Sequence, residues 1–141
     1  MISAKENYYV YAKSTFQAVK LAGITMEEKY KAYTEHADFI SVLSYLKTED
    51  GGRKTPATSG YRPQVKFEFD KMQTSGQQTF IDKKTVYPGD TVEAAIKILS
   101  TAHFHGRLKE GMAFEFREGP KLIGHGVIKY ILNDKLKQGY K

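Results

Sequence analysis

The stretch that decides the fold runs from Thr48 to Gln64 and reads TEDGGRKTPATSGYRPQ. Three glycines and two prolines in so short a run exclude a helix and argue against a regular central strand. The pair Gly51-Gly52 takes positive φ at little cost, so the chain can reverse direction there. The flanking runs, 39–47 and 65–69, are rich in the apolar residues typical of strands. We therefore predict a long, specific loop between two strands.

The chain beyond this loop alternates strand-like runs with turns. Tyr87-Pro88-Gly89-Asp90 places proline and glycine as a β-turn requires, and Gly119-Pro120 marks another turn. The polar residues 71–78, which include Gly76, are predicted to form a turn as well. Further strands are expected at 78–81, 91–99, 112–117 and 122–132.

Six strands without helices between them predict a mainly β fold, a six-stranded closed antiparallel β-barrel. Gly124 and Gly126 in the last strand fit a sharp bend at a barrel corner. The tail 133–141 is polar and basic, and we expect it to fray.

An N-terminal α-helical hairpin is predicted to precede the barrel. Ser3 with Glu6, and Thr25 with Glu28, have the spacing of a capping box, and apolar residues follow at helical steps. The chain thus divides into residues 1–36, the hairpin, and residues 37–141, the barrel. The hairpin is dense in tyrosine, which we interpret as packing against the rest of the protein, with an aromatic binding platform as the alternative.

Composition narrows the class of protein. The formal net charge of +6 favours contact with phosphates or acidic proteins, although it also serves solubility. Cysteine is absent, which excludes disulfides and thiolate metal sites and fits a cytoplasmic protein. No apolar run approaches the roughly 20 residues that span a bilayer, so we expect no membrane partner.

The residues that carry chemistry form no enzyme constellation. His103 and His105 lie two apart without an evident third metal ligand, so we interpret them as solvated and expect no metal site. The run 51–55 lacks the leading glycine and following helix of a phosphate loop. We expect a non-enzymatic protein with no catalytic residues, no cofactor and no small-molecule substrate.

Basic residues instead gather with aromatic ones at two places. Arg53, Lys54, Tyr61 and Arg62 lie in the first loop, and Arg107, Lys109 and Arg117 lie near the last hairpin. Loops converge at the ends of a barrel, where such a rim can follow a nucleic-acid backbone.

Several motifs together resemble one known family. They are Asp50-Gly51-Gly52-Arg53, Gly60-Tyr61-Arg62-Pro63-Gln64, Tyr87-Pro88-Gly89-Asp90, the run 110–119 (EGMAFEFREG) and the run 123–128 (IGHGVI), and His36-Ala37-Asp38-Phe39 before them fits as well. In this order and spacing, they are similar to the third, C-terminal domain of elongation factor Tu over residues 36–132. The resemblance implies a six-stranded antiparallel barrel. It also implies contacts with the T stem of tRNA, with the nucleotide-exchange factor and with the GTPase domain.

The resemblance also implies binding residues. Gln64 corresponds to a polar group that faces tRNA, and Arg117, Glu118 and Gly119 form the turn along the RNA backbone. Thr74 is the counterpart of a residue in the polar turn, and Arg53 belongs to the basic loop end.

The chain departs from the family in places. Ser100-Thr101 replace a basic or imidazole side chain and a proline, and Pro120 replaces a glycine. The GTPase domain and second barrel have no counterpart in this sequence, so we expect no GTP-driven delivery of tRNA.

Three functions are consistent with these features. The first is a binding module related to translation that contacts tRNA, other RNA or a translation-apparatus component. The second is a protein-interaction module that mimics the third domain, as a decoy or immunity-type factor. The third is a structural remnant without activity. The sequence leaves the partner and the oligomeric state open.

Overall fold

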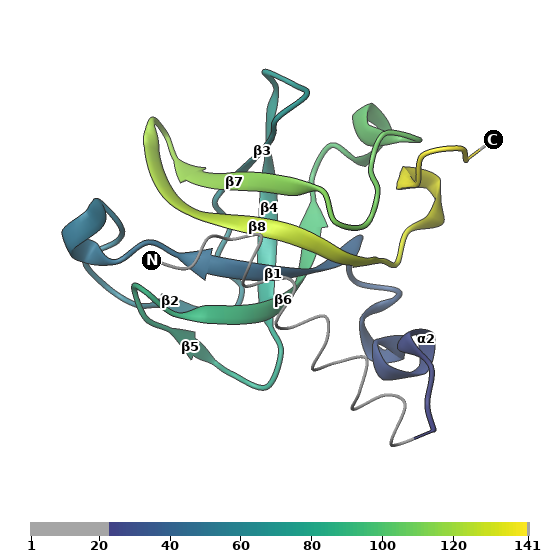
Figure 1. Cartoon of the computed structure of the whole chain (residues 1–141), viewed down its shortest axis with the longest axis horizontal. Helices are drawn as coiled ribbons and strands as arrows, with labels where there is room; N and C mark the ends of the chain where they lie inside the picture. Colours follow the sequence, from purple (N-terminus) through teal and green to yellow (C-terminus); the bar gives the residue numbers. More distant parts are fainter. Residues whose placement is uncertain (1–22, 141) are drawn as a thin grey trace.

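The structure, a computed structural model, describes residues 23–140. Its main feature is a closed barrel of six antiparallel strands (Figure 1). The barrel strands are β1 (Phe39–Tyr45), β3 (Gln64–Phe67), β4 (Gln73–Phe80), β6 (Thr91–Ile98), β7 (Ala113–Glu118) and β8 (Lys121–Ile131). Around the barrel they follow the order β1-β6-β4-β3-β7-β8, and β8 closes against β1. The predicted barrel is confirmed.

The loop 48–64 connects β1 to β3, as predicted, and contains two short elements. They are the 3₁₀ helix η2 (Thr48–Asp50) and the strand β2 (Ala57–Thr58), which pairs with β5 (Thr85–Val86) in a second, two-stranded sheet. Gly51 has a φ of +96° at the end of η2. A Cβ at Gly52 would lie 2.3 Å from the Leu46 carbonyl oxygen, so this turn needs glycine. The small sheet was not predicted.

Aromatic side chains fill the barrel interior. The ring centroids of Phe39, Phe67 and Phe114 lie 5.6, 5.9 and 6.4 Å from one another, with tilted or edge-on planes. A Cβ at Gly126 would lie 2.2 Å from Phe114 Cζ, and one at Gly124 would lie 2.4 Å from a Phe116 ring carbon. The glycines of β8 therefore make room for two phenylalanine rings.

Strand β4 corrects the predicted turn at 71–78. Residues 73–80 form a full strand between β3 and β6, and the turn before it is shorter. Its inward-facing residues are Thr74, Gly76 and Gln78 before Phe80, so no apolar alternation marks the strand. Gln78 is buried, and its Oε1 accepts a hydrogen bond from the Tyr45 hydroxyl, which stabilises a polar group inside the barrel.

The predicted helical hairpin is not supported. Its first helix lies outside the described residues. The second is only the short helix α2 (Met26–Lys29), which continues into the 3₁₀ helix η1 (Lys31–Tyr33). Thr25 caps α2 as predicted, since its Oγ1 accepts from the Glu28 backbone N–H at 3.1 Å. The helix ends at Tyr30, which has a φ of −104° and a ψ of 12°. The buried Tyr30 ring packs with Ile40 and Ala95 on the barrel wall.

Two further 3₁₀ helices follow the strands β6 and β8. They are η3 (Thr101–Phe104), with a buried Phe104, and η4 (Asp134–Leu136), with a buried Leu136. The prediction of a frayed tail is wrong up to residue 140, because Leu108 N–H donates to the Leu136 carbonyl and Gln138 N–H donates to the Leu108 carbonyl, both at 2.8 Å. None of the helices in residues 23–140 has the length and apolar character needed to cross a bilayer.

Candidate nucleic-acid interface

A row of polar side chains crosses three neighbouring strands on the outside of the barrel. Gln64 on β3 is the register partner of Ser75 on β4 and of Arg117 on β7. All three are half-buried, whereas their chain neighbours Val65, Thr74 and Phe116 face the interior. The structure thus brings together Gln64 and Arg117, which the sequence places 53 positions apart (117 − 64).

A second row continues this surface towards β6. Gln77 on β4 pairs with Lys97 on β6, two residues along from Ser75. Arg62, Ser75, Gln77 and Lys97 line a shallow hollow of about 170 Å³ together with Ile98 and Leu99. The lining contains two cations and two uncharged polar side chains, and no carboxylate. We call the set Arg62, Gln64, Ser75, Gln77, Lys97 and Arg117 the polar strip.

Thr74, a predicted binding residue, lies away from the polar strip. Its side chain points into the barrel, where 3% of the residue is exposed. Its Oγ1 accepts a hydrogen bond from the Ser100 backbone N–H at 3.1 Å, which fixes the end of β6 to β4. Its neighbour Ser75 occupies the outer position, because successive residues of a strand face opposite sides.

Arg53 and Glu118, two other predicted binding residues, bind each other. The Arg53 guanidinium forms a salt bridge with Glu118 and lies over the Tyr61 ring, with 4.6 Å from Cζ to the centroid. The Tyr61 hydroxyl donates to the same carboxylate. Burial and the Glu118 carboxylate raise the pKa of Tyr61, so its hydroxyl stays protonated at neutral pH. This cluster connects loop 48–64 to the β7–β8 hairpin, and within it the positive charge of Arg53 is paired with the Glu118 carboxylate.

Arg117 is held at the edge of the same hairpin. Its Nε donates to Glu115 Oε1 at 3.1 Å, and its Nη1 donates to the Pro120 carbonyl at 2.9 Å. Gly119, between Glu118 and Pro120, is exposed in the tight turn with a φ of +59°. The Arg117 guanidinium is thus partly neutralised and is oriented along the hairpin.

A family model described as the elongation factor Tu C-terminal domain matches residues 32–132. The chain belongs to this family. The match runs from η1 to the residue after β8, so the elongation factor Tu C-terminal domain accounts for all six barrel strands. The family assignment supports a module related to translation factors, with partners in the translation apparatus.

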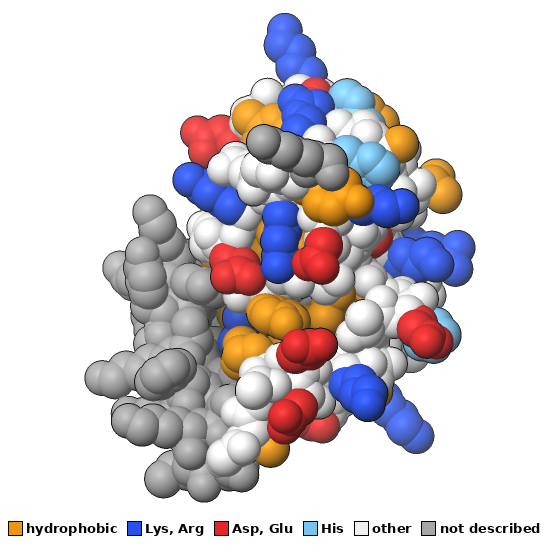
Figure 2. Space-filling model, turned by 90° about the vertical axis from the view of Figure 1, so that its right-hand side faces the viewer, with side chains coloured by type: hydrophobic (Ala, Val, Ile, Leu, Met, Phe, Trp, Pro, Cys, Tyr) orange, Lys and Arg blue, Asp and Glu red, His pale blue; other side chains and the backbone are white. Residues whose placement is uncertain are grey.

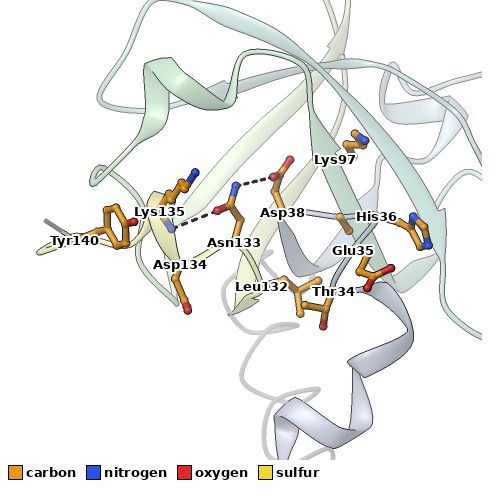
Figure 3. Close-up of a pocket in the computed structure, with 11 residues that line it drawn as sticks. Thr34, Glu35, His36, Asp38, Lys97, Leu132, Asn133, Asp134, Lys135 and Tyr140 are labelled. Atoms are coloured by element: carbon orange, nitrogen blue, oxygen red, sulfur yellow. Dashed lines mark hydrogen bonds between the residues drawn. The ribbon is translucent and has the colours of Figure 1, made fainter.

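A face with mixed charges lies where β1 begins and β8 ends in this elongation factor Tu-type barrel. Figure 2 shows acidic, basic and apolar side chains interspersed on that face. One hollow on that face, of about 490 Å³, is lined by both signs of charge, including Glu35, Asp134, Lys135 and also Lys97 of the polar strip (Figure 3). Its buried carboxylate, Asp38, is engaged in the fold, because it accepts from the Ile98 N–H at 2.8 Å and from Asn133 Nδ2 at 3.1 Å. Such a lining matches no single class of ligand.

Of the two histidines predicted to be solvated, His103 takes part in a surface cluster. His103 Nε2 lies 2.5 Å from Asp70 Oδ2, and Arg107 Nη1 lies 3.2 Å from the same atom. A hydrogen bond from the Met72 N–H, and then one from His103, lower the pKa of Asp70. His105 is exposed. Among residues 23–140, no three histidines, aspartates or glutamates lie close enough to hold a metal ion.

Sequence reasoning did not place Ser75, Gln77 and Lys97 in the site. Their outward direction follows from the β4 register, and most of β4 lies in the segment 71–78 that is predicted to be a turn, with only its end in the strand predicted at 78–81. The one sequence signal is the alternation of small or polar residues in 73–80. The structure explains it, because Gly76 faces Val65, and a Cβ added at Gly76 would lie 2.4 Å from Val65 Cγ2.

Proposed function

We propose that this chain is a non-enzymatic, cytoplasmic RNA-binding module of the translation apparatus, which binds the sugar-phosphate backbone of tRNA through the polar strip. The observation that carries the proposal is the cross-strand row Ser75–Gln64–Arg117 with Lys97 and Arg62 beside it. Serine, glutamine, lysine and arginine are the side chains that proteins place on phosphate and sugar oxygens. Family membership supports the choice of tRNA as the RNA.

The chemistry of the strip favours backbone contact over base reading. Neighbouring strands lie about 4.8 Å apart, so the four strands of the strip span roughly 14 Å. The surface is shallow, and a shallow surface suits the exposed edge of an RNA helix, whose minor groove displays 2′-hydroxyls and phosphates. We therefore expect weak sequence preference and strong dependence on salt.

The test is a titration of labelled total tRNA by fluorescence anisotropy, repeated at several salt concentrations. Lys97→Ala and Arg62→Ala should each weaken binding and reduce the slope of log K against log[salt] by about one, because each removes one phosphate contact. Lys83→Ala is the matched control, since Lys83 is an exposed lysine in the loop between β4 and β5. Absence of binding at low salt, or equal losses for Lys83→Ala, would contradict the proposal.

A protein partner is the second candidate, favoured by Leu99. This side chain is 80% exposed beside Arg62 and Lys97, an arrangement typical of an apolar anchor in a charged rim. A pull-down from lysate with this protein as bait, run with and without RNase, distinguishes an RNA partner from a protein partner. RNase-resistant capture of one translation protein, lost with Leu99→Ser, supports this candidate, and RNase-sensitive capture supports the first.

A further inference from the structure

A second groove lies at the end of the barrel where β1 finishes and β6 begins. It measures about 660 Å³ and separates loop 48–64 from the turn that precedes β6. Its lining comprises Lys47, Thr48, Glu49, Lys54 and Pro56 on one side, and Tyr87, Pro88, Gly89 and Asp90 on the other. The lining combines an aromatic ring, two prolines, two lysines and two carboxylates.

Tyr87 is the largest exposed group of this groove. It is 58% exposed, so burial in the core does not account for a tyrosine here. The turn beneath it is well held. Asp90 Oδ2 accepts from the Tyr87 N–H at 2.9 Å, and the Asp90 N–H donates to the Tyr87 carbonyl at 2.9 Å. The Gly89 N–H donates to the Tyr45 carbonyl at 3.1 Å, which ties the turn to β1. The ring is therefore presented to solvent on a preorganised support.

Two lysines and two carboxylates surround the ring, and among the described residues Lys54 is the cation of this groove that forms no salt bridge. Asp90 already accepts the Tyr87 N–H, and Glu49 lies 4.0 Å from Lys47 with most of its side chain in water. Lys54 is exposed. An exposed aromatic ring beside two lysines suits a nucleobase stacked on the ring with phosphates near the ammonium groups. A phosphate-linked strand uses both features at once, whereas an apolar peptide would use only the ring.

We infer that this groove, centred on Tyr87 with Lys47 and Lys54, binds a single-stranded RNA segment by stacking one base. The inference rests on the proposed function, because it assigns a second contact to the same RNA. The two sites are connected through the fold, since Lys54 follows Arg53, whose guanidinium pairs with Glu118 next to Arg117.

The test uses the full chain and a labelled single-stranded adenosine hexamer, measured by fluorescence anisotropy at low salt. Tyr87→Ala should weaken hexamer binding about 10-fold, the scale of one lost base stack. Tyr87→Phe keeps the ring and should bind like the parent protein. Lys54→Ala should reduce the salt slope by about one. Circular dichroism verifies that each variant is folded, and Tyr87 is an exposed turn residue whose replacement should leave the fold intact.

The outcomes separate the two sites. If Tyr87→Ala binds the hexamer as tightly as the parent while Lys97→Ala loses tRNA affinity, the groove inference is overturned and the proposed function stands. If neither RNA binds the parent protein, both are overturned. If adenosine monophosphate binds as tightly as the hexamer, the groove is a nucleotide site and the assignment to a strand is overturned.

Discussion

The Tyr30 hydroxyl donates a hydrogen bond to Glu93 Oε1 at 2.6 Å and so joins the helical segment before the barrel to strand β6. Glu93 Oε2 also lies 2.8 Å from Lys129 Nζ on β8. The side chains of Lys129 and Glu93 are 2% and 13% exposed. Three separate segments therefore meet at one carboxylate on the outer wall of the barrel, and this carboxylate is the natural place to probe stability.

Glu93→Gln should destabilise the protein by about 3 kcal/mol. The amide keeps the size of the side chain but removes the negative charge that lies 2.8 Å from the buried Lys129 ammonium, and removing one charge of a buried pair is costly. Urea unfolding followed by circular dichroism measures the change. The double variant Glu93→Gln with Lys129→Met removes the buried lysine charge as well and should recover much of the loss. A double variant that is less stable than Glu93→Gln alone would contradict the mechanism.

The contribution of Glu93 should also depend on pH. Burial raises the pKa of Glu93, but hydrogen bonds from Lys129 and Tyr30 act against it, and the pKa lies below its ordinary value. A carboxyl with a depressed pKa stabilises the fold above the pKa of the unfolded chain, about 4.3, and loses that contribution as pH falls through its folded value. The difference in unfolding free energy between the parent and Glu93→Gln should be constant from about pH 8 to pH 5 and shrink below about pH 4. A gap unchanged at pH 3 would count against this assignment.

Gly124→Ala should cost about 2 kcal/mol or more. The new Cβ would lie 2.4 Å from Phe116 Cζ and 2.5 Å from the Ser44 carbonyl oxygen, and neither a core ring nor a paired strand can move away freely. Gly119→Ala is the control, because no atom lies within 4 Å of its added Cβ. Only its φ of +59° opposes the change, at about 1 kcal/mol. Thermal unfolding ranks the two, and an equal loss would show that ring contact in the core is not the cause.

Glu118→Gln should raise affinity for tRNA severalfold. The change removes the charge that pairs with Arg53 and leaves that guanidinium free for a phosphate, so the salt slope should increase by about one. The loss in stability should stay below about 1 kcal/mol, since the pair is partly exposed. Glu110→Gln is the control, because it changes the net charge of the protein by the same amount at an exposed residue that is not part of the polar strip. If both variants gain affinity equally, net charge and not Arg53 is responsible.

The barrel could be predicted from the sequence because five of its strands carry apolar residues on the inner face, as Val65 and Phe67 do on β3. The sixth, β4, was predicted only at its end, as a strand at 78–81, because its inner positions before Phe80 hold Thr74, Gly76 and Gln78. These small or polar groups are accommodated by partners far away in sequence, such as the Tyr45 hydroxyl on Gln78. A local pattern does not contain that information.

The candidate site was predicted only in part for a related reason. Gln64 and Arg117 were identified from motifs, and the register brings them together. Whether a side chain is free or already engaged depends on long-range contacts, and the pairing of Arg53 with Glu118 is one of these. Likewise, a shift of one residue in β4 separates an interior threonine from an outward serine.

The circular order of the strands limits how this molecule can recruit others. Each of the six barrel strands donates and accepts its backbone hydrogen bonds within the ring, so none of them offers an open border on which a foreign strand could be added. A molecule recruited to the barrel wall must instead be recognised by side chains and loops. Surface substitutions can therefore retune what the module binds while the scaffold beneath stays the same.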